Sequence, residues 1–199
     1  MILRINGEMI DFTPENEATL GEVLGSLESE CERSCQTITN IKIDGNIIPA
    51  EHLDEVFSRK PESVESIELE TINGDHIRTL LAESGATLLA FIPRLEQIPV
   101  ELQTGKDMEV MESINAFSLE LQNLYRLLPL MPLTGIQYEE VLFEDRPIHE
   151  CPNLLSPLLE DLLSALKEND TIMIGDISEY ELAPRISRLG ETLSQLRQK

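Results

Sequence analysis

The chain has 199 residues, of which 41% are hydrophobic and 26% charged, a composition that argues against wholesale disorder and allows one large or two small domains. Its formal net charge is -22, from 15 basic and 37 acidic residues. Because a field of this sign repels phosphate backbones and anionic lipid, we expect no nucleic-acid partner and no membrane partner, and we favour a basic protein partner.

The first third of the chain opens with a hairpin and a helix. Residues 2–12 predict two strands joined at Asn6-Gly7, a strong two-residue turn signal. Thr19 then predicts a helix N-cap, and Glu22 completes a capping box. Apolar residues follow at helical spacing, so we expect a helix to about Cys31 or beyond.

Strand signals return after this helix. Residues 38–43 predict a strand that closes at the turn 44–46, and residues 47–48 are a candidate return strand. A short helix is expected within residues 49–57. Residues 64–72 largely alternate apolar with polar side chains, which predicts a strand with one solvated face.

The resulting order of strand, strand, helix, strand, short helix and strand resembles the β-grasp, or ubiquitin-like, arrangement over residues 1–72. The resemblance implies a mixed sheet that wraps one helix. No Gly-Gly terminus follows, because the chain runs on through Asn73-Gly74, so we expect no conjugation or sulfur-carrier role. The ferredoxin variant would need four cysteines, and this segment has only Cys31 and Cys35.

The pattern changes to helical periodicity after Gly74. We expect a long helix that is bent or broken near Pro93 and Pro99, followed by a second helix from Asp107 to Leu128. Met108 and Met111 on the second helix suit an adaptable binding surface, although core positions are commoner at this spacing.

The remainder predicts a connector at 129–152 and two further helices. Asn153 is the expected cap of a helix over 154–167, and Asp170 that of a helix continuing past Pro184 to about residue 196. The apolar stretch 130–136 either folds over the end of a bundle or is an exposed docking element. We therefore predict an α+β protein: a β-grasp-like mixed α/β domain at 1–73 and a helical bundle of three to five helices at 74–199.

Two observations predict a soluble cytoplasmic protein. No window approaches the ~18 apolar residues of a membrane-spanning helix, and Met1 to Gly7 does not begin a signal peptide. The three cysteines, an odd number, indicate reduced thiols and not a disulfide framework.

Residue types with catalytic or metal-binding chemistry form no recognisable motif. Cys31, Cys35, His149 and Cys151 are a legitimate zinc ligand set, but their spacing is unlike that of structural zinc sites, so we expect ordinary thiols and no metal. The other histidines, like His149, have acidic neighbours and lie in no known catalytic motif. Gly-rich phosphate loops are absent. We therefore predict no catalytic residues, no cofactor and no enzyme activity.

The stretch 169–184 is the most distinctive, and it resembles uncharacterised bacterial helical proteins. Asp176, Glu179 and Tyr180 are the candidate partner-binding residues, because on a helix they lie beside apolar side chains where unpaired carboxylates are costly. The commoner alternative is that they tie their helix to a neighbour through one of three arginines. Those arginines are Arg78, Arg126 and Arg185.

These features favour a non-enzymatic cytoplasmic adaptor or chaperone-like protein that binds a basic or amphipathic helix, with a homodimer as a further prediction. Acidic helical bundles are similar in kind to bacterial export and flagellar chaperones. The alternative is a small-ligand or metal-binding regulatory protein that uses the junction between the two halves. A third candidate is an enzyme without a recognisable motif, with carboxylates at that junction.

Overall fold

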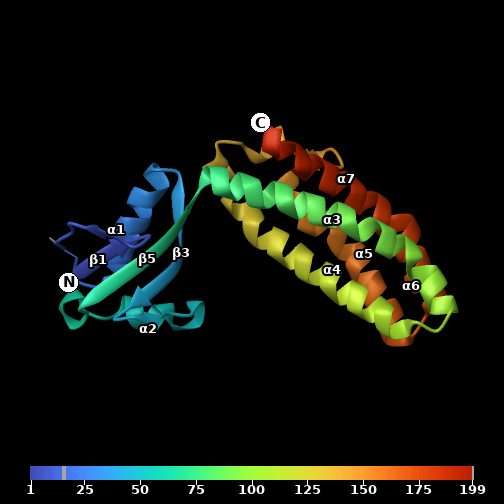
Figure 1. Cartoon of the computed structure of the whole chain (residues 1–199), viewed down its shortest axis with the longest axis horizontal. Coiled ribbons are helices and arrows are strands. Elements are labelled where there is room, and N and C mark those ends of the chain that lie inside the picture. Colours follow the sequence, from blue (N-terminus) through green and yellow to red (C-terminus); the bar gives the residue numbers. More distant parts are fainter. Residues whose placement is uncertain (15–16, 199) are drawn as a thin grey trace. The chain divides into compact units, whose positions relative to one another are not determined.

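A five-stranded sheet with a helix against one face occupies the first part of the computed structural model, which describes residues 1–14 and 17–198 (Figure 1). The sheet order is β2-β1-β5-β3-β4; β1 is parallel to β5, and the other neighbouring pairs are antiparallel. The strands are β1 (Ile2–Ile5), β2 (Glu8–Ile10), β3 (Gln36–Ile43), β4 (Asn46–Ile47) and β5 (Ser66–Asn73).

Local sequence signals account for these boundaries. Asn6 and Gly7 have φ of 51° and 85°, the conformation that a two-residue hairpin turn requires. Helix α1 (Leu20–Arg33) starts where the Thr19 hydroxyl accepts a hydrogen bond from the Glu22 amide at 3.2 Å. The Glu22 carboxylate accepts from the amide of Ala18 at 2.6 Å, one residue before the position that a capping box uses.

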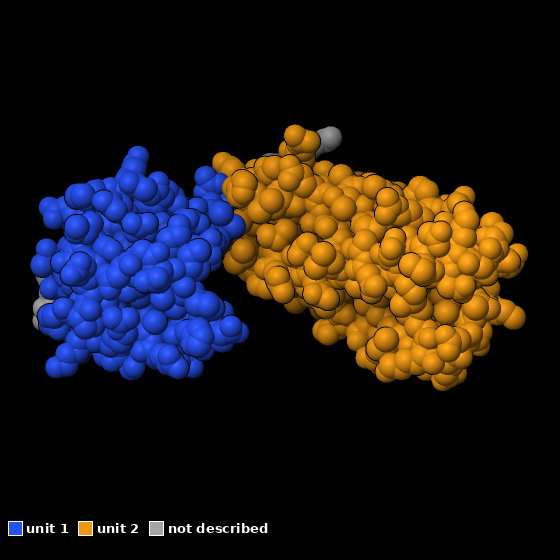
Figure 2. Space-filling view, turned by 60° about the horizontal axis from the view of Figure 1, so that its bottom comes forward, with its two compact units in different colours: residues 1–74 blue, residues 75–199 orange. Residues whose placement is uncertain are grey.

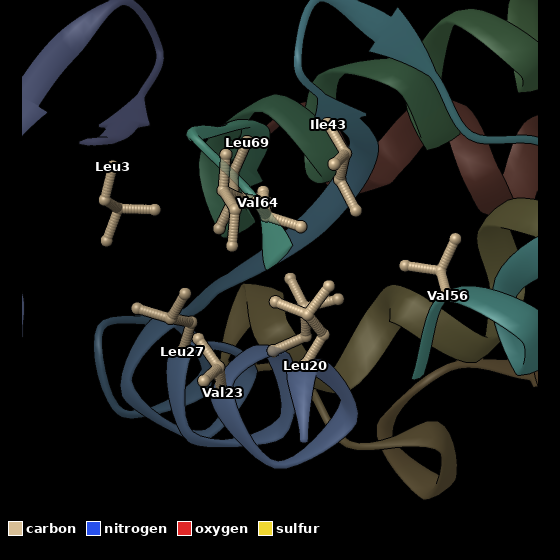
Figure 3. Packing of buried hydrophobic residues seen from close by; sticks show 10 residues of the cluster. Leu3, Leu20, Val23, Leu27, Ile43, Val56, Val64 and Leu69 are labelled. Carbon is tan, nitrogen blue, oxygen red and sulfur yellow. The ribbon is translucent and has the colours of Figure 1, made fainter. Parts of the chain in front are cut away.

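The core of this first unit lies between α1 and the sheet (Figure 3). Leucines and valines at helical spacing on α1 meet every second residue of the strands, because strand side chains alternate between the two faces. The short helix α2 (Leu53–Phe57) adds Val56. The buried cluster consists of Leu3, Leu20, Val23, Leu24, Leu27, Ile43, Val56, Val64, Ile67 and Leu69.

The chain divides into two units, Met1–Gly74 and Asp75–Lys199 (Figure 2). The second unit is mostly helical. The fold is therefore α+β. The helices after the sheet are α3 (Gly74–Gln103), α4 (Asp107–Leu127), α5 (Cys151–Glu168), α6 (Thr171–Asp176) and α7 (Ala183–Ser194), with a hairpin β6 (Leu142–Phe143) and β7 (Arg146–Pro147) before α5. A π-helical segment, η6 (Ile177–Leu182), lies between α6 and α7.

Three expectations for these helices need correction. Helix α3 contains Pro93 and Pro99 without interruption, so the break expected as one of two alternatives is absent, although each proline lacks the amide hydrogen for one helical bond. Helix α5 begins at Cys151 and not after Asn153, because Pro152 occupies the first turn, where its missing amide costs nothing. The expected fourth helix begins at the predicted cap, where the Asp170 carboxylate accepts a hydrogen bond from the Met173 amide at 3.0 Å. It is not one regular α-helix, however, because the π-helical segment η6 interrupts it.

Specific contacts hold the helices and the connector of the second unit together. Helices α3 and α7 approach closely at two glycines, since a Cβ added to Gly85 would lie 2.8 Å from the carbonyl oxygen of Gly190. Phe91 of α3 meets Phe117 of α4 edge to face, with ring centroids 5.8 Å apart. The connector after α4 folds onto the bundle, because Met131 is fully buried, which favours the first of the two expectations for residues 130–136.

In the part of the chain that the structure describes, no helix has the length and apolar character needed to cross a membrane.

Candidate functional site

An apolar groove of about 540 Å³ runs between α4 and α5. Its α4 wall comes from residues three or four apart, which share one helix face, and its α5 wall is formed by leucines and one lysine. The lining residues are Met111, Ile114, Asn115, Ser118, Leu121, Gln122, Tyr125, Leu159, Leu162, Leu163, Leu166 and Lys167.

Large apolar side chains are exposed along this groove and on the adjoining face of α4. Met111 and Leu163 line the groove with 42% and 50% of their surfaces exposed. Met108 and Leu119, on the same helix as Met111, are 75% and 58% exposed. The core positions favoured for Met108 and Met111 were therefore wrong. Contiguous exposed apolar surface of this kind marks a contact site.

Five of the twelve lining residues are polar, namely Asn115, Ser118, Gln122, Tyr125 and Lys167. The Tyr125 hydroxyl is buried and has no hydrogen-bond partner among the described residues. Burial, with a smaller contribution from Cys151, raises the pKa of Tyr125, so its hydroxyl stays protonated and remains a donor. Lys167 is the only charged side chain among the lining residues.

The three predicted partner-binding residues lie together at the junction of α6 and η6. Asp176 and Tyr180 are exposed, and Glu179 is half-buried. The negative charge of Glu179 raises the pKa of the Tyr180 hydroxyl, with smaller contributions from their hydrogen bond and from Asp176, so the three are neighbours. Asp176 also lines a small hollow of about 140 Å³ with residues of α3, which include Pro99.

Two of the three arginines proposed as ties for these carboxylates, Arg78 and Arg185, act elsewhere. Arg78 donates to the Thr134 carbonyl at 2.8 Å, and Arg185 donates to the Leu154 carbonyl at 3.2 Å. Arg185 also lies 3.6 Å from the Glu144 carboxylate in the β6–β7 turn. The tie through Arg78 or Arg185 is therefore wrong, while partner binding by Asp176, Glu179 and Tyr180 stays a prediction.

The cysteines and His149 do not form a ligand set within either unit. Cys31 and Cys35 belong to the first unit, whereas His149 and Cys151 belong to the second, where the His149 ring lies against Tyr138 with centroids 4.6 Å apart. Among residues 1–14 and 17–198, no group of three or more histidine, cysteine or acidic side chains is placed to hold a metal ion.

Thiol accessibility gives a direct check on these placements. Cys35 is exposed, whereas Cys31 and Cys151 are buried. Burial raises the pKa of both buried thiols, that of Cys151 to about 12, so little thiolate is present there at pH 8. We expect iodoacetamide to add one label to the native protein and three labels in denaturant, as measured by intact mass. Rapid native labelling of Cys151 would contradict its burial.

Comparison with known proteins covers both units. A family model described as the TP0873 N-terminal domain matches residues 1–73, and one described as a domain of unknown function, DUF8042, matches residues 79–192. An uncharacterised protein of Treponema pallidum (strain Nichols) is 33% identical over 191 residues, which cover 96% of this chain and 95% of the relative. No solved structure matches the chain significantly.

Proposed function

This chain belongs to the bacterial family of two-domain proteins that join a TP0873 N-terminal domain to a DUF8042 domain. We propose that it is a non-enzymatic, chaperone-like adaptor that binds an amphipathic helix of a partner protein. The observation that carries the proposal is the exposed apolar groove between α4 and α5. From Met111 to Tyr125 the groove follows fourteen residue steps of α4, about 21 Å at 1.5 Å per residue. A partner helix of about fourteen residues fits this length.

Charge favours a partner helix with basic residues beside its apolar face. Helices α4 and α5 together carry seven acidic and two basic residues. Glu112 and Glu160 each follow a groove-lining residue and are exposed, so they lie on the two shoulders of the groove. Lysine or arginine at the edge of the partner's apolar face would reach these carboxylates, which favours basic over acidic helices.

The order of elements in the first unit supports a finer assignment of its fold. We propose the β-grasp arrangement, on the strand order β2-β1-β5-β3-β4 and the packing of α1 against one face. We also propose a cytoplasmic location, because all three cysteines are free thiols, which suits a reducing compartment.

A designed peptide tests the groove directly. The probe is a fluorescent sixteen-residue helix with leucines at i, i+3, i+4 and i+7 and lysines on its shoulders, compared with a peptide carrying glutamates instead. We expect the lysine peptide to bind in the micromolar range by fluorescence anisotropy. Leu163→Glu should weaken this binding at least 10-fold, because it places a carboxylate inside the apolar contact.

A matched control separates groove binding from general attraction to an acidic protein. Leu142→Glu makes the same change at a leucine of β6 that is 53% exposed and does not line the groove, so it should leave the affinity unchanged. Equal affinity of the native protein and Leu163→Glu for the lysine peptide, or equal binding of the glutamate peptide, would overturn the proposal.

A further inference from the structure

The face of the sheet opposite α1 carries one continuous row of side chains across all five strands. Arg4 of β1 is directly opposite Met9 of β2 and Glu68 of β5. Glu68 is in turn opposite Lys42 of β3, and Lys42 is opposite Ile47 of β4. Since directly opposed residues point to the same face, the row reads apolar, positive, negative, positive, apolar.

This row lies on the face of the sheet that points away from the hydrophobic core. Leu3 and Ile67, one residue before Arg4 and Glu68, belong to the cluster packed against α1, so Arg4 and Glu68 point the other way. Met9 and Ile47 at the two ends are 68% and 64% exposed. An exposed sheet face with apolar ends and ordered charges is suited to a contact.

Charge is balanced on this face, unlike on the rest of the unit. Arg4 Nη1 lies 3.1 Å from Glu68 Oε1, and Lys42 Nζ lies 2.7 Å from Glu70 Oε1, while the Asn40 amide also donates to Glu70 at 2.7 Å. These contacts lower the pKa of Glu70 and raise that of Lys42, so both remain charged at neutral pH. Residues 1–74 as a whole have 5 basic and 16 acidic side chains.

We propose that this face binds a second copy of the same chain, forming a symmetric dimer through the row Met9–Arg4–Glu68–Lys42–Ile47. Two copies of so acidic a protein repel one another over most of their surfaces, and this balanced face is where the repulsion is relieved. Self-recognition also follows from the alternation of sign, because a row of this kind is complementary to itself when displaced by one strand.

A two-fold axis parallel to the strands and between β1 and β5 provides that displacement. It places Arg4 of each copy opposite Glu68 of the other, and the Lys42 of each copy over the Met9 of the other. The aliphatic part of the lysine side chain then covers the methionine while its ammonium stays in water. An axis through β5 itself would bring Glu68 against Glu68, which charge repulsion disfavours.

The size of the face sets the expected strength. Strands β3 and β5 are eight residues long, whereas β1, β2 and β4 have four, three and two residues. At about 3.3 Å per residue and about 4.8 Å between strands, the sheet face covers at most roughly 400 Å² per copy. That is below the ~800 Å² per partner of a standard stable interface, so we expect a weak dimer with a dissociation constant in the micromolar range or above.

Sedimentation velocity of the full chain over a range of concentrations tests the dimer. Glu68→Lys converts the row to three positive charges and should raise the dissociation constant at least 10-fold. The double variant Arg4→Glu with Lys42→Glu gives a wholly negative row and should also be monomeric. Mixing the two variants should restore a dimer, which also shows that both variants are folded.

Controls distinguish this contact from the groove in the second unit. Glu62→Lys makes the same charge change at an exposed residue off the row and should leave dimerisation unchanged. Met9→Lys, on the edge strand, should weaken the dimer by repelling Lys42 without disturbing the core. A protein that stays monomeric at millimolar concentration, a dimer unaffected by Glu68→Lys and Met9→Lys, or one lost with Leu163→Glu instead, would overturn the proposal.

Discussion

Phe117→Ala is expected to lower the free energy of unfolding of the second unit by about 3–5 kcal/mol, which is the usual cost of deleting a buried aromatic ring. Phe117 is 1% exposed and packs edge to face against Phe91. Its removal leaves a cavity between α3 and α4 in addition to the lost transfer free energy. Urea denaturation followed by circular dichroism measures the change through the transition of this unit.

Leu119→Ala is the matched control for this loss. Leu119 lies two residues further along α4 but is 58% exposed, so its truncation should change stability by less than about 0.5 kcal/mol. Similar losses for the two variants would mean that α4 presents a different face to the bundle from the one described.

Gly85→Ala should lower the free energy of unfolding of the same unit by about 1–3 kcal/mol, although alanine is the better helix former by about 1 kcal/mol. The added Cβ would lie 2.8 Å from the carbonyl oxygen of Gly190, from Cβ of Leu193 and from the amide nitrogen of Ser194. Two of these atoms belong to the backbone of α7, so relief requires the two helices to separate.

Gly25→Ala makes the same substitution on α1, where no atom beyond the adjoining backbone of α1 lies within 4 Å of the new Cβ. It should therefore raise the stability of the first unit by about 0.5–1 kcal/mol through helix propensity alone. The opposite signs of the two changes are the diagnostic result. Stabilisation by Gly85→Ala would rule out the close approach of α3 and α7.

Much of the first unit could be predicted because its signals are local. The turn Asn6-Gly7 and the cap at Thr19 each depend on a few adjacent residues, and both are present. The alternation in 64–72 likewise reported a strand with one solvated face. The order of the strands in the sheet was available only through resemblance, since it depends on pairings such as that of β1 with β5, more than sixty residues apart.

The errors in the second unit come from prolines and from hydrogen-bond register. A bend or a break was expected at Pro93 and Pro99, but the long helix around these positions continues through both. Pro152, by contrast, was an unused signal for the start of α5, because proline favours the first helical turn. The π segment is too short to change the apolar periodicity of the sequence, so the sequence did not predict it.

The groove could not be predicted, because it depends on which two helices lie side by side. The available signal was the pair Met108 and Met111, whose apolar stripe was assigned to the core. Periodicity identifies an apolar face, but it does not show whether another helix covers that face. The polar patch at Asp176 was found because its residues are neighbours in sequence.

The π segment explains how α6 and α7 can both face α3. On α3, Gly85 and Pro99 are fourteen residues apart, which is two heptads and returns to the same side of a packed helix. The residues that they contact on α7 and α6 are Gly190 and Gly175, respectively. These two glycines are fifteen residues apart, one more than two heptads. In a regular helix of 3.6 residues per turn, fifteen steps would rotate the second glycine about 60° past the first, away from the side that faces α3. The wide turn of η6 takes up that one residue, so the segment has the form of a single-residue insertion accommodated without loss of either glycine contact.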